Sequence, residues 1–251
     1  VKKGWVKKRK IFNQAPERYQ GFAFNMQKPP FNDRRVRLAV CHLFNREQLF
    51  EKLFFNEYEF IDSYFPGRDW GNEDKNPKIR YDPDLAEELL FEAGYEERDD
   101  QGFLVNANGE RFSLTLEYAS QGWERIWLVV QKDFIEAGID LQLKLIDAST
   151  LMQKVSDRQF RIHYQLWGAL LFPNPETSWR SDLADKKANN NICGFKNERV
   201  DELCEQYNVT FDRAEQKKII REIDEIIFKE HPYALGWYAN FNRLLYWDRF
   251  G

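Results

Sequence analysis

Strand-like and helix-like hydrophobic patterns follow one another in mixed order along this chain. Leu114, Leu116 and Tyr118 alternate with polar residues, which indicates a half-buried strand. In residues 212–231 the apolar side chains recur instead with the period of a helix. No strict strand–helix–strand repeat runs through the sequence. The pattern predicts an α/β fold in which helices flank a mixed β-sheet.

The segment YDPDLAEELLFEAGY (81–95) predicts a helix together with both of its ends. Asp82 can accept hydrogen bonds from first-turn amides, and Pro83 has no amide proton to leave unpaired. Gly94 can adopt the left-handed conformation that ends a helix. An apolar stripe is expected from Leu85, Leu89 and Leu90.

Capping residues and apolar periodicity predict the remaining helices and strands. Asp33, Asn45 and Asp212 stand where each can cap the start of a helix. The expected strands cover 19–26, 139–146, 160–168 and 232–247, and the expected helices cover 34–44, 46–55, 122–137, 148–158, 197–209 and 212–231.

Two connections carry turn signals. Asn108 and Gly109 predict a tight type I′ turn in a hairpin over 102–118. Residues 62–80 contain several Pro and Gly and predict a long loop. Loops of this length in compact domains are usually functional or mobile.

The charge balance argues against a nucleic-acid partner. The net charge is −4, whereas nucleic-acid binders normally carry a basic excess. The basic residues gathered near the start of the chain predict a solvated edge or a linker; they are Lys2, Lys3, Lys7, Lys8, Arg9 and Lys10.

Aromatic residues are abundant, with 21 Phe, 11 Tyr and 8 Trp. Most of them must belong to the core. Eight Trp exceed what a core of this size usually needs. Because Trp and Tyr combine a flat apolar face with a polar tip, they suit a site that stacks on ligands.

No metal, cofactor or catalytic site is predicted. The three cysteines, Cys41, Cys193 and Cys204, form no CxxC pair, and the histidines are scattered. One disulfide could form in an oxidising compartment, but the sequence does not specify which pair. Adjacent helical residues point about 100° apart, so Cys41 and His42 do not predict a nucleophile–base pair.

The sequence contains neither a transmembrane span nor a signal peptide. It also lacks an initiator Met and opens in a polar, basic segment. We therefore expect it to be a fragment or a processed piece.

Five segments, taken in order, resemble family 5 extracellular solute-binding proteins, the dipeptide- and oligopeptide-binding group. They are FNMQKPPFNDRRVRLAVCHLFNREQL (24–49), YDPDLAEELLFEAGY (81–95), the 122–137 helix followed by GIDLQLKLI, NNNICGFKNERVDEL (189–203), and the Ile-rich helix leading into HPYALGWY. The tail FNRLLYWDRFG is similar to the branch that takes murein-type and microcin-type peptides.

The resemblance implies the C-terminal lobe of a two-lobed, hinged protein with the type II periplasmic-binding-protein fold. Residues 1–18 would be a hinge-proximal linker, 19–251 the lobe, and 19–26 the region near the interlobe crossover. The implied partners are a peptide or peptide-like solute, the membrane permease of an ABC transporter and the missing N-terminal lobe. The implied location is periplasmic or extracellular, where such proteins can carry a lipid anchor.

The resemblance also places a ligand-facing loop after 160–168. Many family members carry an Asp there that pairs with the amino terminus of a peptide, but the matching position here is Leu170. Glu176 is the nearest acid, and it has an alternative role as a charge at a helix N-terminus. Further candidate ligand-binding residues, each with an alternative structural role, are Trp167, Trp179, Arg180, Asn191, Phe24, Asn25 and Tyr238, with Tyr64 on the long loop as a weaker candidate.

Two other functions stay open at this point. A carbohydrate-binding or carbohydrate-processing protein would use the same aromatic residues as sugar platforms, and an enzyme of this kind needs two acids that face each other across a cleft. A receptor-type sensor would keep the binding fold and dock on another partner. Neither alternative is excluded by composition.

Overall fold

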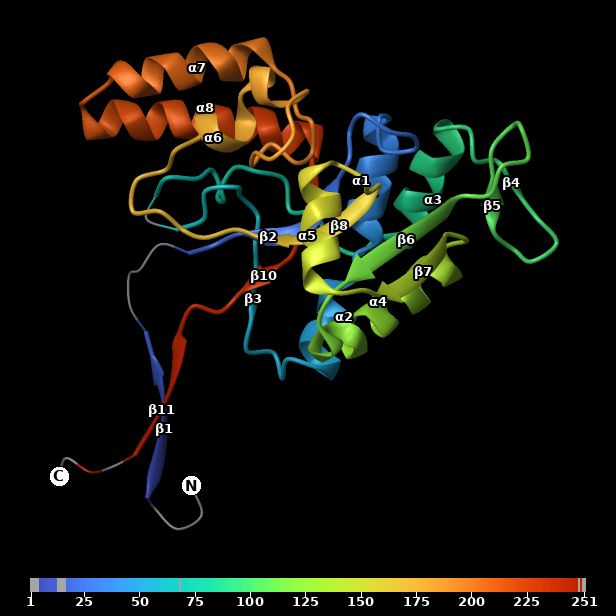
Figure 1. Ribbon diagram of the computed structural model, residues 1–251, viewed down its shortest axis with the longest axis horizontal. Helices are drawn as coiled ribbons and strands as arrows, with labels where there is room; N and C mark the ends of the chain where they lie inside the picture. The colour runs from blue at the N-terminus through green and yellow to red at the C-terminus, as the bar shows by residue number, and fades with distance from the viewer. Residues whose placement is uncertain (1–4, 13–16, 68, 248, 250–251) are drawn as a thin grey trace.

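A three-stranded antiparallel sheet at the centre of the fold joins three distant parts of the chain, in the order β8 (Ile162–Leu166), β2 (Gln20–Phe24) and β9 (Tyr233–Leu235). The computed structural model describes residues 5–12, 17–67, 69–247 and 249 (Figure 1). All five residues of β2 are buried. A Cβ at Gly21 would lie 2.2 Å from the carbonyl oxygen of Ala234, so only glycine allows β9 to approach β2 this closely.

A parallel pair of strands, β6 (Ser113–Tyr118) and β7 (Asp140–Leu145), lies beside this sheet. The connection between them runs through the 3-10 turn η1 (Gln121–Trp123) and helix α4 (Glu124–Glu136). Leu114 and Leu116 are buried while Thr115 between them is exposed, which confirms the alternating pattern.

Among the other helices, α1 packs against α3, the long pair α7 and α8 packs with α6, and α5 lies against β6 (Figure 1). Their bounds are α1 Arg34–Leu43, α2 Arg46–Lys52, α3 Pro83–Glu92, α5 Ala148–Ser156, α6 Glu176–Trp179, the 3-10 turn η2 Ser181–Leu183, α7 Glu198–Val209 and α8 Arg213–Glu230.

The remaining strands form short antiparallel pairs. These are β3 (Glu59–Phe60) with β10 (Trp237–Tyr238), β4 (Glu97–Arg98) with β5 (Leu104–Val105), and β1 (Val6–Ile11) with β11 (Asn242–Trp247). The β1–β11 pair is a ribbon that extends away from the body of the molecule (Figure 1). The predicted linker thus contains a strand, while Lys2 and Lys3 lie outside the described residues.

The predicted helix caps are confirmed at each start. The side chains of Asp33, Asn45, Asp82 and Asp212 all accept hydrogen bonds from amides of the turn that follows. Gly94, with φ of +93°, ends α3 in the left-handed conformation as expected.

Two local predictions are wrong. Gly109 has φ of +75°, but Asn108 does not have the positive φ that a type I′ turn requires. The side-chain oxygen of Asn106 instead accepts from the amides of Asn108 and Glu110, and the turn takes another form. In α3, Leu85 is 36% exposed and Ala86 is buried in its place, so the apolar stripe is turned by about one residue.

Buried side chains form two hydrophobic clusters, and strand β2 contributes to both. Phe22 and Phe24 belong to the first, with α1, α4, β6 and β7, whereas Ala23 belongs to the second, with α7 and α8. This follows from the geometry of a strand, in which successive side chains point to opposite faces. The strand therefore ties the two halves of the core together.

All three cysteines are buried and unpaired. Burial raises the pKa of the Cys41 and Cys193 thiols to about 12. No helix in the described part of the chain is long and apolar enough to cross a membrane. The described residues also contain no group of three or more His, Cys, Asp or Glu side chains arranged to hold a metal ion.

We predict that His163 makes the stability of the fold depend on pH. Burial on β8 lowers the pKa of its imidazole from 6.5 to about 4. Below pH 6.5 the unfolded chain binds the proton more tightly than the folded chain, so this contribution to stability is lost as the pH falls towards 4. The loss is about 2–3 kcal/mol between pH 7.5 and pH 4.5.

Urea unfolding of the wild type and of His163→Gln at the two pH values measures this loss. The free energy of unfolding of the wild type relative to the variant should fall by that amount at the lower pH. An unchanged difference would show that His163 is not the residue responsible.

Candidate functional site

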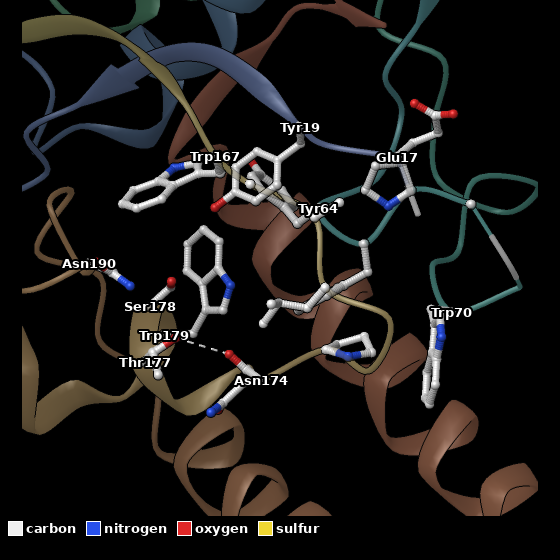
Figure 2. A pocket seen from close by; sticks show the side chains of 17 residues that line it. Glu17, Tyr19, Tyr64, Trp70, Trp167, Asn174, Thr177, Ser178, Trp179 and Asn190 are labelled. Atoms are coloured by element: carbon white, nitrogen blue, oxygen red, sulfur yellow. Dashed lines mark hydrogen bonds between the residues drawn. The ribbon is translucent and has the colours of Figure 1, made fainter. Parts of the chain in front are cut away.

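A cavity of about 280 Å³ opens between the loop that follows β8 and the long loop that precedes α3 (Figure 2). Aromatic and polar side chains line it together. The aromatic ones are Tyr19, Tyr64, Phe65, Trp70, Trp167 and Trp179, and those with polar groups are Glu17, Asn174, Thr177, Ser178 and Asn190.

Ring contacts hold the aromatic wall in one arrangement. The ring of Tyr19 lies 5.5 Å from that of Tyr64 and 6.4 Å from that of Trp167, centroid to centroid. Tyr64 meets Trp179 edge-to-face at 5.1 Å. The indole N–H of Trp167 donates to the hydroxyl of Tyr233 at 3.0 Å. Because these rings are packed before any ligand arrives, little conformational freedom remains to be lost on binding.

The position of this wall follows from strand pairing. The backbone N–H of Trp167 donates to the carbonyl of Tyr19 at 3.0 Å, which continues the β2–β8 ladder by one step. Tyr19 and Trp167 are thereby placed side by side at the end of the sheet. Trp179 comes from α6 and is buried in the second cluster, and Trp70 stands on the opposite side of the cavity (Figure 2).

Glu17 is the only charged side chain among the described residues that line the cavity. Burial and the nearby carboxylate of Glu59 raise its pKa, and the adjacent Arg18 opposes this. Glu17 forms no ion pair with another described residue. A carboxylate in this setting is an acceptor for a cationic or hydrogen-bond-donating group of a ligand.

Of the residues predicted from sequence, Trp167 and Trp179 are brought together in the cavity. Tyr238 lies outside it, where its hydroxyl is 2.7 Å from a carboxylate oxygen of Glu59. It lines a neighbouring hollow of about 570 Å³ that shares Glu17, Gly168 and Ala169 with the cavity.

The predicted charged residues Glu176 and Arg180 do not line the cavity. Glu176 accepts a hydrogen bond from the amide of Asn208 at 2.7 Å, although its neighbours in α6 do face the cavity. Arg180 pairs with Asp182 at 3.0 Å and approaches Glu205 at 3.7 Å. In this structure both charges have partners in the protein.

The three remaining candidates are buried and have structural partners. Phe24 stacks on Phe31 with ring centroids 4.6 Å apart. The amide of Asn25 donates to the carbonyls of Arg158 and Phe160 at 3.1 and 3.0 Å. The amide of Asn191 donates to the carbonyls of Arg180 and Phe195, and its oxygen accepts from the amide of Phe195. None of them faces the cavity, and ligand contact by these residues stays a prediction.

Sequence reasoning missed Glu17, Tyr19 and Trp70. Glu17 fell within the segment assigned to a linker, and Tyr19 was expected only as part of a strand. Trp70 was a detectable signal, because it lies on the long loop that was expected to be functional. Tyr64, on the same loop, was noted only as a weak candidate.

A cavity with a packed aromatic wall and several neutral polar groups is typical of domains that bind small organic solutes. The profile described as "Bacterial extracellular solute-binding proteins, family 5 Middle" matches residues 3–190. The chain belongs to family 5 of the bacterial extracellular solute-binding proteins.

Curated relatives and solved structures agree with this family. The probable peptide-binding protein YejA of Agrobacterium fabrum is 26% identical and aligns with 99% of this chain and 46% of its own length. The oligopeptide-binding protein AppA of Bacillus subtilis is 26% identical over 92% of this chain and 43% of its own. The structure of AppA in complex with a nonapeptide superposes with a TM-score of 0.86 at 22% identity, covering 98% of this chain and 48% of AppA.

These matches confirm the α/β fold of the type II periplasmic-binding-protein kind. The chain spans about half the length of the relatives it matches. Family membership places it among periplasmic or extracellular proteins, and the named relatives are binding proteins. The division at residue 18 and the assignment to a peptide branch stay predictions, and part of the tail used for the branch lies outside the described residues.

We predict that Asn191 stabilises the turn before α7. Asn191→Ala removes three side-chain hydrogen bonds. Phe195 is fully buried, and its backbone N–H and carbonyl both lose their partner, whereas the carbonyl of Arg180 keeps the amide of Leu183. The free energy of unfolding should fall by about 2–4 kcal/mol.

Urea denaturation of Asn191→Ala can be compared with that of Asn190→Ala. Asn190 is exposed and lines the cavity, so its replacement should change stability by less than about 0.5 kcal/mol. Equal losses in the two variants would contradict a structural role specific to Asn191.

Proposed function

We propose that this chain is the C-terminal lobe of the solute-binding component of an ABC importer, which captures peptides or peptide-like solutes and delivers them to a membrane permease. A second lobe of the same protein closes over the cavity. The protein is located in the periplasm or outside the cell, where a lipid anchor can attach it to the membrane. It binds and releases its solute without making or breaking bonds. Hinged closure around a ligand is a common mechanism of such carriers.

The observation that carries this proposal is the cavity with an aromatic wall and one carboxylate. Its volume of about 280 Å³ is at the low end for a small-molecule site, as expected where another lobe supplies the rest. Trp167 is half-buried and provides a flat apolar face for side chains of the solute, while the buried Trp179 supports the wall. The neutral groups of Asn174, Thr177 and Ser178 provide hydrogen bonds to the backbone of the solute.

Glu17 is our candidate for recognition of a peptide amino terminus. Leu170 stands at the position where the family resemblance places an Asp, and it is 61% exposed at the edge of the cavity. Glu176 has Asn208 as a partner and does not line the cavity. Glu17 does line it, at its edge, with the carboxylate directed away from the aromatic wall (Figure 2). It forms no ion pair with a described residue, so its carboxylate is available to an ammonium group at the edge of the cavity.

The carbohydrate alternative is less well supported. A glycosidase needs two carboxyl groups that flank the bond to be cleaved. Among the described residues that line the cavity, Glu17 is the only acid. A sensor would use the same cavity and differ only in the protein on which it docks.

Mass spectrometry of small molecules that co-purify with the complete gene product from its native source tests the solute class. We expect peptides or peptide-like compounds. Recovery of oligosaccharides without peptides would overturn the proposal.

We predict that Trp167→Ala weakens binding of a pool of synthetic pentapeptides to the complete gene product by roughly fivefold to thirtyfold. The reason is the loss of a stacking face, which is worth about 1–2 kcal/mol. Native mass spectrometry measures the bound fraction. Trp247→Ala, on the ribbon far from the cavity, is the control and should bind as the wild type does; equal affinity in all three proteins would remove Trp167 from the site.

We predict that Glu17→Gln lowers affinity for pentapeptides with a free amino terminus by roughly tenfold to a hundredfold, because a charge-assisted hydrogen bond is worth about 1.5–3 kcal/mol. The same peptides with an acetylated amino terminus should bind the wild type and the variant equally. A similar loss for both peptide pools would show that Glu17 does not read the ammonium group. Isothermal titration calorimetry gives the four affinities.

A further inference from the structure

The long loop that supplies one wall of the cavity is wrapped around a single carboxylate from another part of the chain. Asp224, on α8, is fully buried. One of its oxygens accepts from the backbone N–H of Tyr64 at 2.8 Å. The other accepts from the backbone N–H of Asn72 at 2.8 Å and from the side-chain amide of Asn76 at 3.1 Å.

Asp224 forms no salt bridge with a described cation. Asp62, at the start of the same loop, differs in this respect, since it pairs with Arg80 at 3.0 Å and Lys78 at 3.2 Å. A buried carboxylate without a cation is costly unless hydrogen-bond donors surround it. Asp224 therefore depends on the loop for its donors, and the amides of Tyr64 and Asn72 depend on Asp224 for an acceptor.

The loop has no regular secondary structure to hold it in place. Its described residues, 61–67 and 69–82, contain neither a helix nor a strand. Its backbone is nevertheless tightly folded, because a Cβ at Gly71 would lie 2.7 Å from the carbonyl oxygen of Phe65. In the absence of a ladder of backbone hydrogen bonds, side-chain acceptors such as Asp224 fix the conformation.

Asp224 does not line the cavity, but Tyr64, which it holds, does line it, and so does Trp70 of the same loop. The backbone N–H of Tyr64 is bonded to Asp224, and the ring of the same residue packs edge-to-face against Tyr19 and Trp179. Trp70 lies in the sequence between the anchored residues Tyr64 and Asn72, and its ring centroid is 6.4 Å from that of Phe172. Release of the loop would therefore move two aromatic rings of the wall without any loss of a ligand contact by Asp224 itself.

We propose that Asp224 is a positioning residue for the solute cavity: its carboxylate clamps residues 64–76 and so sets the place of Tyr64 and Trp70 against the rest of the aromatic wall. The expected effect on binding rests on the proposed function, whereas the clamp itself is independent of that function.

The clamp requires a carboxylate. Each of its two oxygens takes donors from a different part of the loop, Tyr64 on one side and Asn72 with Asn76 on the other. In Asp224→Asn one oxygen is replaced by an NH₂ group, which is a donor only. Whichever oxygen it replaces, the NH₂ group would face a backbone N–H of the loop, that of Tyr64 or that of Asn72. Two donors cannot bond to each other, so one of these two hydrogen bonds must be lost.

Hydrogen exchange measured by mass spectrometry on peptic fragments tests the clamp. In Asp224→Asn we expect exchange in residues 63–76 to rise tenfold or more, with α4 and β6 unchanged. Asp133→Asn is the matched control, because Asp133 is also a buried helical carboxylate but lies in the first cluster, on α4. Unchanged exchange in the loop of Asp224→Asn, or an equal rise in Asp133→Asn, would overturn the inference.

Asn76→Ala is a milder variant in case Asp224→Asn does not fold. It removes one donor to Asp224, together with the hydrogen bond from Asn76 to the carbonyl of Asp62, and leaves the carboxylate in place. Hydrogen exchange in the loop of Asn76→Ala should be severalfold faster than in the wild type, but slower than in Asp224→Asn. An unchanged rate would count against the clamp.

Binding of the pentapeptide pool to the complete gene product provides the second measurement. Asp224→Asn should bind at least tenfold more weakly, whereas Asp133→Asn should match the wild type. If loop exchange rises while affinity is unchanged, the positioning role is wrong. If the wild type binds no peptide, the proposed function fails while the exchange result still decides whether the clamp exists.

Discussion

Strand β2 is the element on which the rest of the structure depends. Its alternating side chains enter both hydrophobic clusters, and its two edges pair with β8 and β9. Gly21 allows β9 to lie so close that any side chain there would collide with the backbone. The cavity depends on the same register, since Tyr19 and Trp167 face one another only because the pairing of β2 with β8 continues one residue past the strands. A shift by one residue would turn each of them to the opposite face.

Hydrophobic burial fixes the regular elements, whereas buried polar side chains fix the irregular ones. Asp224 holds the long loop, and Asn191 holds the turn before α7. The guanidinium of Arg158 donates to the carbonyls of Leu183 and Asn191, and Asn25 holds the carbonyl of Arg158 in turn. Each of these side chains replaces a hydrogen-bond ladder that the loop backbone lacks. The second cluster thus serves as the rigid support of the cavity.

This division explains how much could be predicted from the sequence. Caps such as Asp82 and terminating glycines such as Gly94 act within a few residues, so their patterns are visible locally and the elements were predicted well. Phe24 and Asn25 were assigned to ligand binding because of their place near the crossover; both are fully buried in this structure, and their role in binding stays a prediction. Glu17 lies in the cavity because of long-range packing, which no local pattern records.

The exposed rim beside the cavity shows where the remaining binding energy would come from. Leu170, Leu171 and Phe172 are 61%, 48% and 50% exposed, next to a wall whose own rings are already packed. A wall that is rigid before binding adds little entropic cost, and apolar residues at its rim gain contacts only when something covers them. On the proposed function, the covering surface is the second lobe, so that solute capture and lobe closure bury this rim in the same step. The affinity for the solute then depends on closure, and reopening the lobes is enough to release it.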